Sequence, residues 1–255
     1  KELWVSSLKG LYKINIDNNI PNLKFTKTIS SINNIVSNGD KIVVSDNFLN
    51  LKNIDSLGIL SENIIPDKIR KTLNIDFTES SYCLTFGNRK NIFIGTINEG
   101  IIEIDSNKQI NYLTKELDGF EKICMAVTKD DIGNIYAGGY NKLFKIDLDK
   151  KITYLEHPQL KRKFIYTLKK IDDKIFIFSD NTILLYAQDS LSDFSTQLKV
   201  YNTNFSNIEK FKDKYILTSF NNGVYILGKN KNDGWQIENH FNKKLSIEGL
   251  LLTML

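Results

Sequence analysis

A unit of about forty residues recurs along this chain of 255 residues. Its clearest copy, NIYAGGYNKLFKID, runs from Asn134 to Asp147 and joins two apolar runs through a small or polar break. Six copies are spaced by 39, 50, 43, 40 and 40 residues, and they open on Leu3, Ile42, Ile92, Ile135, Ile175 and Tyr215. A period near forty with several strands in each copy is typical of a β-propeller. The repeat therefore predicts one all-β propeller domain over residues 1–255, built from four-stranded antiparallel blades.

One predicted blade extends from Lys122 to His157. Four strands are expected there, at 123–128, 135–138, 143–146 and 152–155, with turns rich in Asp, Gly and Asn between them. The second strand is an almost continuous apolar run, which fits a strand that is buried on both faces because blades stack against each other.

The other copies follow the same pattern. First strands are expected at 32–37, 82–86, 164–169 and 208–211, and fourth strands at 23–27, 110–113, 198–202 and 235–240. Residues 60–79 interrupt the repeat with apolar residues at helix-like spacing. They are expected to form either a short helical insertion or an elaborated outer edge.

The two ends of the chain complement each other. Residues 3–6 resemble a second strand with no first strand before it, and residues 245–255 resemble a first strand with no second strand after it. Together they would complete one blade, so we expect six blades, closed by the C-terminal strand joining the N-terminal blade. Closure would remove exposed sheet edges. The alternative is a propeller of seven blades, or a fragment of a longer array.

Charge and hydropathy narrow the classes of partner. The net charge is +4, from 34 basic and 30 acidic residues that are well mixed. Nucleic-acid binding needs a larger one-sided excess, so it is not expected. No apolar run reaches the roughly 18 residues of a membrane-spanning helix, so we expect no membrane insertion within this chain.

Two cysteines, Cys83 and Cys124, occupy matching places in the segments SYCLTF and KICMAV. Matched positions on the innermost strands of neighbouring blades are expected to lie too far apart for a disulfide. The prediction is two buried free thiols that act as small apolar residues.

The segment DDIGNIYAGGYNKLFKID, residues 130–147, resembles the two-component-regulator propeller repeat. That repeat has an Asp-x-x-Gly-Asn turn, a strand, a Gly-Thr-x-x-Gly turn and a second strand. NIFIGTINEGIIEID and ELWVSS match parts of the same pattern, whereas residues 46–50 and 180–182 lack its glycine.

The resemblance implies a recognition module without catalysis, located in the periplasm or at the cell surface. Propellers of this family form sensor domains of bacterial hybrid histidine kinases and often sense glycan fragments. The implied partner is a polar small molecule, an oligosaccharide or a protein. Nothing in the chain resembles a kinase, a receiver or a DNA-binding domain.

Ligands of a propeller bind the face formed by the turns that enter first strands and the turns between second and third strands. The candidate ligand-binding residues on that face are Tyr82, Asn98, Glu99, Lys122, Tyr140, Asn141, Arg162, Asn181, Asn207, Asn221 and Glu248. Amides, carboxylates and aromatic rings near one axis suit a polar ligand such as an oligosaccharide. The competing interpretation is that turns favour Asn for backbone reasons alone.

No catalytic residue, metal site or cofactor is expected. His157 and His240 end fourth strands of different blades, where side chains diverge rather than converge on a metal ion. The aspartates at 105 and 147 resemble fragments of calcium loops but are more simply explained as turns between third and fourth strands.

Two other functions remain open at this stage. One is a metal-dependent hydrolase or lyase like the six-bladed lactonases, for which Glu248, Asn207 and Asp180 could be the central residues. The other is a structural surface protein whose propeller docks another subunit.

Overall fold

The structure is a computed structural model of the chain. It describes residues 2–7, 10–15, 22–26, 32–38, 41–46, 50–54, 61, 63–65, 81–88, 90–230 and 234–241. The chain divides into two compact units, the first ending at Cys124 and the second beginning at Met125. Each unit is described by itself.

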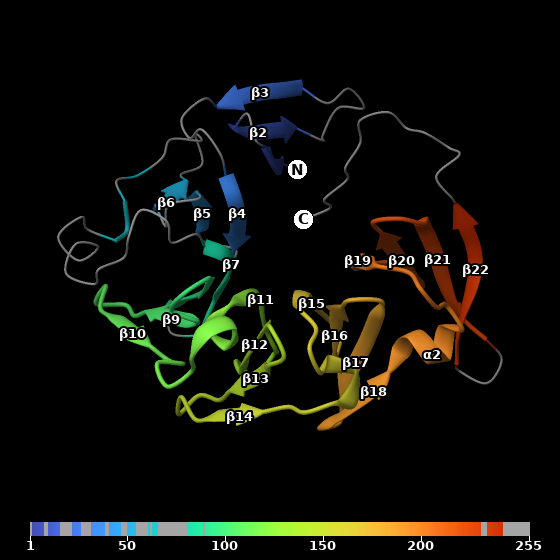
Figure 1. Ribbon diagram of the computed structural model, residues 1–255. Coiled ribbons are helices and arrows are strands. Elements are labelled where there is room, and N and C mark those ends of the chain that lie inside the picture. Colours follow the sequence, from blue (N-terminus) through green and yellow to red (C-terminus); the bar gives the residue numbers. More distant parts are fainter. Residues whose placement is uncertain are drawn as a thin grey trace. The chain divides into compact units, whose positions relative to one another are not determined.

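Three antiparallel sheets form the described part of the first unit (Figure 1). Their strands are β1 (Glu2–Ser7), β2 (Gly10–Asn15) and β3 (Asn22–Thr26); β4 (Ile32–Ser37), β5 (Ile42–Asp46) and β6 (Leu51–Ile54); and β7 (Ser81–Phe86), β8 (Ile92–Thr96), β9 (Ile101–Ile104) and β10 (Ile110–Tyr112). A 3-10 turn, η1 (Gly119–Lys122), follows. In every sheet the strands pair in chain order, as an antiparallel meander.

Three four-stranded sheets form the second unit (Figure 1). Their strands are β11 (Cys124–Lys129), β12 (Ile135–Gly139), β13 (Leu143–Ile146) and β14 (Ile152–Tyr154); β15 (Ile165–Ile171), β16 (Lys174–Ser179), β17 (Thr182–Ala187) and β18 (Ser190–Asp193); and β19 (Phe205–Phe211), β20 (Lys214–Ser219), β21 (Gly223–Lys229) and β22 (Trp235–Phe241). The 3-10 turn η2 (Pro158–Leu160) precedes β15, and the helix α2 (Phe194–Leu198) follows β18. The predicted all-β fold of four-stranded antiparallel sheets is confirmed.

The prediction of a fourth strand at 198–202 is wrong. The fourth strand is β18, which ends at Asp193, and the chain then turns into α2. The Asp193 carboxylate caps this helix by accepting a hydrogen bond from the backbone N–H of Thr196 at 3.0 Å. Phe194 and Leu198 stand four residues apart on the helix, so both reach the same side and are buried. The prediction followed the apolar residues and missed the capping aspartate.

The expected helical or outer-edge segment at 60–79 lies mostly outside the described residues. The described part runs beside β6, because Ser61 and Ile64 donate backbone hydrogen bonds to the carbonyls of Asn53 and Leu51. Ile65 is buried there against the apolar residues of neighbouring strands.

The second strands β8 and β12 are buried on both faces, as an apolar run predicts, whereas the second strand β20 is only partly buried. Every residue of β8 and of β12 is buried. A glycine in β12 allows the next sheet to approach closely, since a Cβ at Gly138 would lie 2.7 Å from Cγ2 of Ile165 in β15. Real Cβ atoms do not come that close, so the sheet spacing there depends on glycine.

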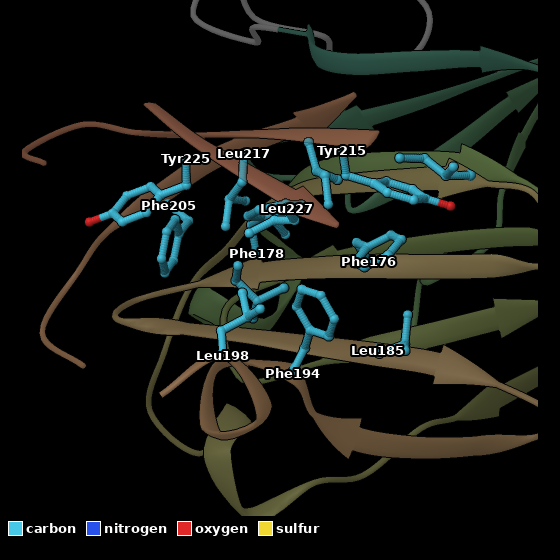
Figure 2. Close-up of a cluster of buried hydrophobic side chains, with 13 residues drawn as sticks. Phe176, Phe178, Leu185, Phe194, Leu198, Phe205, Tyr215, Leu217, Tyr225 and Leu227 are labelled. Atoms are coloured by element: carbon cyan, nitrogen blue, oxygen red, sulfur yellow. The ribbon is translucent and has the colours of Figure 1, made fainter. Parts of the chain in front are cut away.

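The largest described core lies between the sheet β15–β18 and the sheet β19–β22, both in the second unit (Figure 2). Phe176 and Phe194 meet edge to face with their ring centroids 5.2 Å apart. Phe205 and Tyr225 meet in the same way at 5.5 Å. Such tilted aromatic pairs add stabilisation beyond their buried area. Helix α2 therefore contributes a core residue in place of a longer fourth strand.

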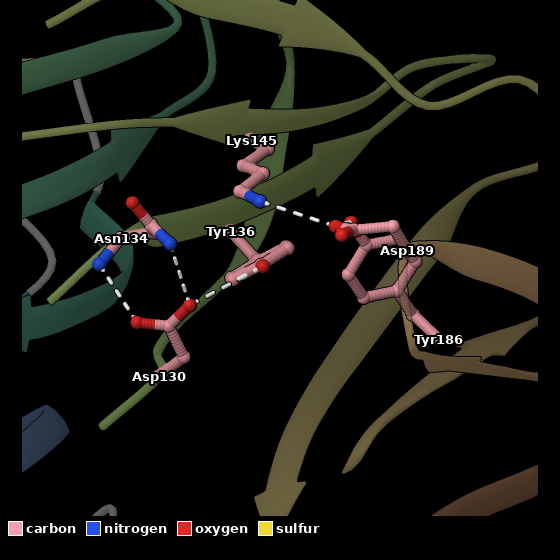
Figure 3. A network of polar contacts seen from close by, with 6 residues as sticks. All are labelled: Asp130, Asn134, Tyr136, Lys145, Tyr186 and Asp189. Carbon is pink, nitrogen blue, oxygen red and sulfur yellow. Dashed lines mark hydrogen bonds and ion pairs between the residues drawn. The ribbon is translucent and has the colours of Figure 1, made fainter. Parts of the chain in front are cut away.

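A second core joins the sheets β11–β14 and β15–β18, and a polar network lies at its edge (Figure 3). The Asp130 carboxylate accepts hydrogen bonds from the backbone N–H groups of Gly133 and Asn134, both at 2.8 Å. It also accepts from the Asn134 amide at 2.8 Å and the Tyr136 hydroxyl at 3.3 Å. These contacts give the Asp-x-x-Gly-Asn motif a structural role, which is to close the turn between first and second strands.

The same network crosses to the next sheet through two tyrosines. The rings of Tyr136 and Tyr186 lie 5.4 Å apart, and the Tyr186 hydroxyl donates to Asp189 at 2.7 Å. Burial, followed by the hydrogen bond to Asp189, raises the pKa of Tyr186 to about 12. Burial also raises the pKa of Tyr136, so both hydroxyls remain neutral donors at physiological pH.

Replacing Phe194 by Ala should lower the free energy of unfolding by about 3–5 kcal/mol, because it empties a fully buried site in the aromatic core. Phe211→Ala is the matched control, since Phe211 is 60% exposed and should cost at most about 0.5 kcal/mol. Urea unfolding followed by tryptophan fluorescence measures both. Equal costs would show that α2 does not anchor this core.

Candidate ligand-binding face

Hydrogen bonds gather one set of turns at one end of the second unit. The backbone N–H of Asn141, in the turn after β12, donates to the carbonyl of Lys163 at 2.8 Å. The Asn141 side-chain oxygen accepts from the backbone N–H of Arg162 at 3.1 Å. A turn between a second and a third strand is thereby held against the segment that enters the next first strand.

The same device continues through the next two sheets. Asp180 accepts from the backbone N–H of Phe164 at 3.3 Å. The side chain of Asn204, just before β19, accepts from the backbone N–H of Asn181 at 2.9 Å. The backbone N–H of Asn204 in turn donates to the side chain of Asn221 at 3.3 Å. Asn141 and Asn204 therefore join successive sheets, whereas Asp180 and Asn221 each hold the turn of a sheet against the segment that enters the same sheet.

We call this surface the turn face. It consists of Tyr140, Asn141, Arg162, Lys163, Phe164, Tyr166, Asp180, Asn181, Asn204, Phe220 and Asn221. Three of its residues, Asn141, Arg162 and Asn181, have positive φ angles of 60°, 59° and 53°. Asn adopts this left-handed conformation more readily than most residues, which explains why Asn is favoured in these turns.

Aromatic rings line the turn face beside the amides. Tyr140 and Phe164 lie 4.9 Å apart and are joined by an isolated β-bridge. Tyr166 and Phe220 meet edge to face at 5.9 Å. Phe220 is 66% exposed. The turn face therefore combines a solvent-exposed ring with hydrogen-bonding groups.

The Tyr166 hydroxyl links two sheets next to the turn face. It lies 2.9 Å from the carbonyl oxygens of both Ser179 and Phe205, which belong to different sheets. Burial, with the negative charge of Asp180 as a second cause, raises the pKa of Tyr166, so the hydroxyl stays a neutral donor.

The charged side chains of the turn face differ in burial and in their hydrogen bonds. The Lys163 ammonium donates to the Thr182 hydroxyl at 2.9 Å and is half-buried. Arg162 is exposed, and Asp180, which accepts from the backbone N–H of Phe164, is exposed as well. A cation, an anion and amides within one small surface can bind a neutral or zwitterionic polar molecule through several hydrogen bonds.

The predicted site residues divide into three groups. Tyr140, Asn141, Arg162, Asn181 and Asn221 are brought together on the turn face. The side-chain oxygens of Asn141 and Asn221 accept hydrogen bonds from backbone N–H groups. Such contacts agree with the competing interpretation, in which turns favour Asn for backbone reasons. The exposed groups that remain for a ligand are chiefly Arg162 and the aromatic ring of Phe220.

Asn207 is not brought to the turn face by any described contact. It lies within β19, and its amide donates to the Glu209 carboxylate at 3.4 Å. Glu209 also pairs with Lys169 on the neighbouring sheet, so this cluster joins strands to one another. The side chain of Tyr82 and the whole of Glu248 lie outside the described residues.

Asn98, Glu99 and Lys122 belong to the first unit. Asn98 and Glu99 form the turn between β8 and β9, where the backbone N–H of Glu99 donates to the Thr96 hydroxyl at 3.0 Å. Lys122 ends η1. These turns correspond in type to those of the turn face.

Sequence reasoning missed Asn204, Phe164, Tyr166 and Phe220 as site residues. Asn204 lies between two copies of the repeat, so the repeat pattern did not indicate it. Phe220 precedes the turn that contains Asn221, and an apolar residue directly before an Asn-Asn-Gly turn was the signal that could have identified it.

The other candidate chemistries have structural explanations. Asp105 accepts from the backbone N–H groups of Asn107 and Gln109, and Asp147 accepts in the same way from Asp149 and Lys151. Both therefore close turns between third and fourth strands, as predicted. Among the residues that the structure describes, no group of three or more His, Cys, Asp and Glu side chains could hold a metal ion.

The histidines lie where the sequence placed them, around fourth strands. His157 follows β14 and accepts at Nδ1 from the backbone N–H of Gln159 at 3.3 Å. His240 lies in β22, stacked on Tyr225 at 4.0 Å between ring centroids, with Nε2 2.7 Å from the carbonyl of Asn222.

Comparison with solved structures shows propeller-like relatives. The chain is similar to the extracellular domains of two putative hybrid two-component systems from B. thetaiotaomicron. The TM-scores are 0.63 and 0.68 at 16% and 13% identity, over 94% and 95% of this chain. The chain spans only about a third of those structures, 34% and 33%. It is also similar to a streptogramin B lyase, with a TM-score of 0.68 and 15% identity over 92% of this chain and 78% of the lyase.

These likenesses agree in fold. The resemblance to two-component-regulator propellers, expected from the repeat, is confirmed by the two extracellular domains. No family model matches the sequence. No curated protein matches it either. In the described part of the chain, no helix is both long and apolar enough to cross a membrane.

Asn204 should be the residue on which the turn face depends most. Asn204→Ala removes the acceptor for the Asn181 N–H and should lower the free energy of unfolding by about 1 kcal/mol. Asn204→Asp keeps an acceptor oxygen and should stay within about 0.5 kcal/mol of the wild type. Thermal unfolding of the two variants measures the difference, and equal losses would contradict the acceptor role.

Proposed function

We propose that the chain is a non-catalytic, sensor-type β-propeller that recognises a polar ligand on the turn face. The observation that carries this proposal is the combination of an exposed ring, Phe220, with an exposed cation, Arg162, on segments whose backbone is held by hydrogen bonds to Asn side chains. Because the turns are already held by hydrogen bonds, ligand binding loses little conformational entropy in ordering them. The likeness to extracellular domains of two-component systems supports the sensor role.

An oligosaccharide is the ligand class that these groups suit best. Sugar rings present apolar C–H faces that pack on aromatic rings, while their hydroxyls pair with amides and charged side chains. The turn face offers both kinds of group, with Phe220 and Tyr140 as rings and Arg162 and Asp180 as hydrogen-bonding partners.

The proposed setting is outside the cytoplasm, in the periplasm or at the cell surface, within a two-component signalling system. The solved relatives support this setting because they are extracellular domains. Since the chain spans about a third of their length, the signal would be passed on by parts outside these residues or by another chain.

The proposed architecture is a six-bladed propeller in which residues 245–255 supply the first strand of the N-terminal blade. In the described four-stranded sheets the second strand pairs with the third strand on one side and with the first strand on the other. β1 corresponds to a second strand, yet among the described residues it pairs only with β2. A strand from the C-terminal segment would fill that place.

A second candidate is a metal-dependent hydrolase or lyase, which the likeness to the streptogramin B lyase favours. A third is a surface protein whose propeller docks another subunit. Bound metal in the purified protein, found by elemental analysis, would favour the enzyme. A turn face that binds no oligosaccharide would favour docking.

Phe220→Ala and Arg162→Ala should each weaken oligosaccharide binding by about 2- to 10-fold, because each removes an exposed contact of the turn face. A panel of neutral and uronic-acid-containing oligosaccharides on a glycan array identifies the ligand. Isothermal titration calorimetry with the best binder then measures the two variants.

Phe211→Ala is the matched control for Phe220→Ala. Phe211 is also exposed, at 60% against 66%, and ends β19 at the opposite end of the same sheet. Its replacement should leave the affinity unchanged. No binder in the panel, or an equal loss with Phe211→Ala, would contradict ligand binding at the turn face.

Deleting residues 245–255 should lower the melting temperature by at least about 5 °C, since it would expose the edge of β1 that faces away from β2 and leave one blade incomplete. Differential scanning calorimetry of the full and shortened chains measures the change. An unchanged melting temperature and an equally sharp transition would show that the C-terminal segment does not close the propeller.

A further inference from the structure

Two cysteine sulfurs meet inside the first unit. Cys83, in β7, and Cys124, which opens β11, are both buried and form no disulfide, as expected. A Cβ built at Gly95 would lie 2.4 Å from Sγ of Cys83 and 2.8 Å from Sγ of Cys124. The two sulfurs therefore stand no further apart than the sum of these distances. The expectation from the sequence concerned the separation of the Cα atoms, which these sulfur distances do not test.

The meeting point depends on Gly95. Cys83 stands opposite Gly95 in the pairing of β7 with β8, and every residue of β8 is buried. The missing side chain leaves a space that both thiols enter, and Sγ of Cys83 also lies 3.9 Å from the carbonyl oxygen of Cys124. Any larger residue at this position would separate the two sulfurs.

We propose that Cys83 and Cys124 are a covalent modification site, which forms a buried disulfide when the chain folds in the presence of a disulfide oxidant. A thiolate of one cysteine attacks the oxidant disulfide, forms a mixed disulfide and expels one thiolate. The thiolate of the other cysteine then attacks the protein sulfur and expels the second. The two protein thiols lose two electrons and two protons in total, and the oxidant disulfide is reduced to two thiols.

The bond forms during folding rather than in the folded chain. In the folded chain Cys83 is 9% and Cys124 1% exposed, so an oxidant reaches the two thiols far less readily than in the unfolded chain. Burial, followed by a hydrogen bond with the Cys124 thiol, also raises the pKa of the Cys83 thiol, which makes the reactive thiolate scarce. A disulfide that forms before the chain has folded is then buried, which protects it from reduction.

The bond would tie together the segment that carries β8, β9 and β10. Closing a loop of about 40 residues restricts the unfolded chain, and the corresponding rise in melting temperature is about 5–10 °C. The consequence is a sheet that is held covalently at the end of the first unit without any exposed bridge.

The test refolds the denatured full chain in glutathione buffer, either with excess glutathione disulfide or with reduced glutathione alone. The products are unfolded again without reductant and labelled with N-ethylmaleimide, and their intact masses are measured. The proposal expects no maleimide after oxidative refolding and two after reductive refolding. It also expects a cross-linked peptide that contains Cys83 and Cys124. Two maleimides in both samples, or a stable glutathione adduct on one cysteine, would overturn it.

Melting temperatures provide a second readout. The oxidised wild type should melt about 5–10 °C above the reduced wild type. The Cys83→Ala/Cys124→Ala double variant is the control and should melt at one temperature in both buffers. A redox-dependent shift of the same size in the double variant would overturn the assignment. This outcome does not depend on ligand binding at the turn face, so the two proposals fail separately.

Discussion

The close approach of successive sheets is the constraint on which the described structure depends. A strand buried on both faces can pack only if its neighbour comes near, and Gly138 shows how this is achieved. Its missing Cβ admits Ile165 of the next sheet, and aromatic rings such as Phe176 and Phe194 fill the space between the following pair. Because each sheet is stabilised by the next, no single sheet carries its own core.

Sheet packing also explains why the turns at one end of the second unit form a fixed surface. Once the sheets are in contact, the turn of one and the entering segment of the next lie within hydrogen-bonding distance. Asn141 and Asn204 accept backbone hydrogen bonds from the neighbouring sheet there, and Asn221 accepts one from the segment that enters its own sheet. The side chains that remain exposed, chiefly Phe220 and Arg162, are held in place by turns that need no further ordering. A binding surface thus arises from the same contacts that stabilise the fold.

The glycine at the matching place in the first unit has a different consequence. At Gly95 the space admits two thiols rather than one aliphatic side chain. The same packing device, with Cys83 and Cys124 around it, becomes a place where a covalent bond can form. The matching glycines therefore have different neighbours. Gly138 admits the aliphatic side chain of Ile165, and Gly95 admits the thiols of Cys83 and Cys124.

The sequence by itself determined what is local and periodic. The forty-residue repeat, the apolar second strands and the Asp130 turn follow from short-range pattern, and the described strands confirm them. Only the tertiary structure decided which distant residues meet. Asn204 reaches Asn181 because packed sheets bring together residues that the period does not relate. The repeat gives Cys83 and Cys124 matching places, but only the packing shows that both sulfurs lie beside Gly95. Helix α2 was also decided by the structure. The cap by Asp193 favours a helix where the sequence pattern predicted a fourth strand.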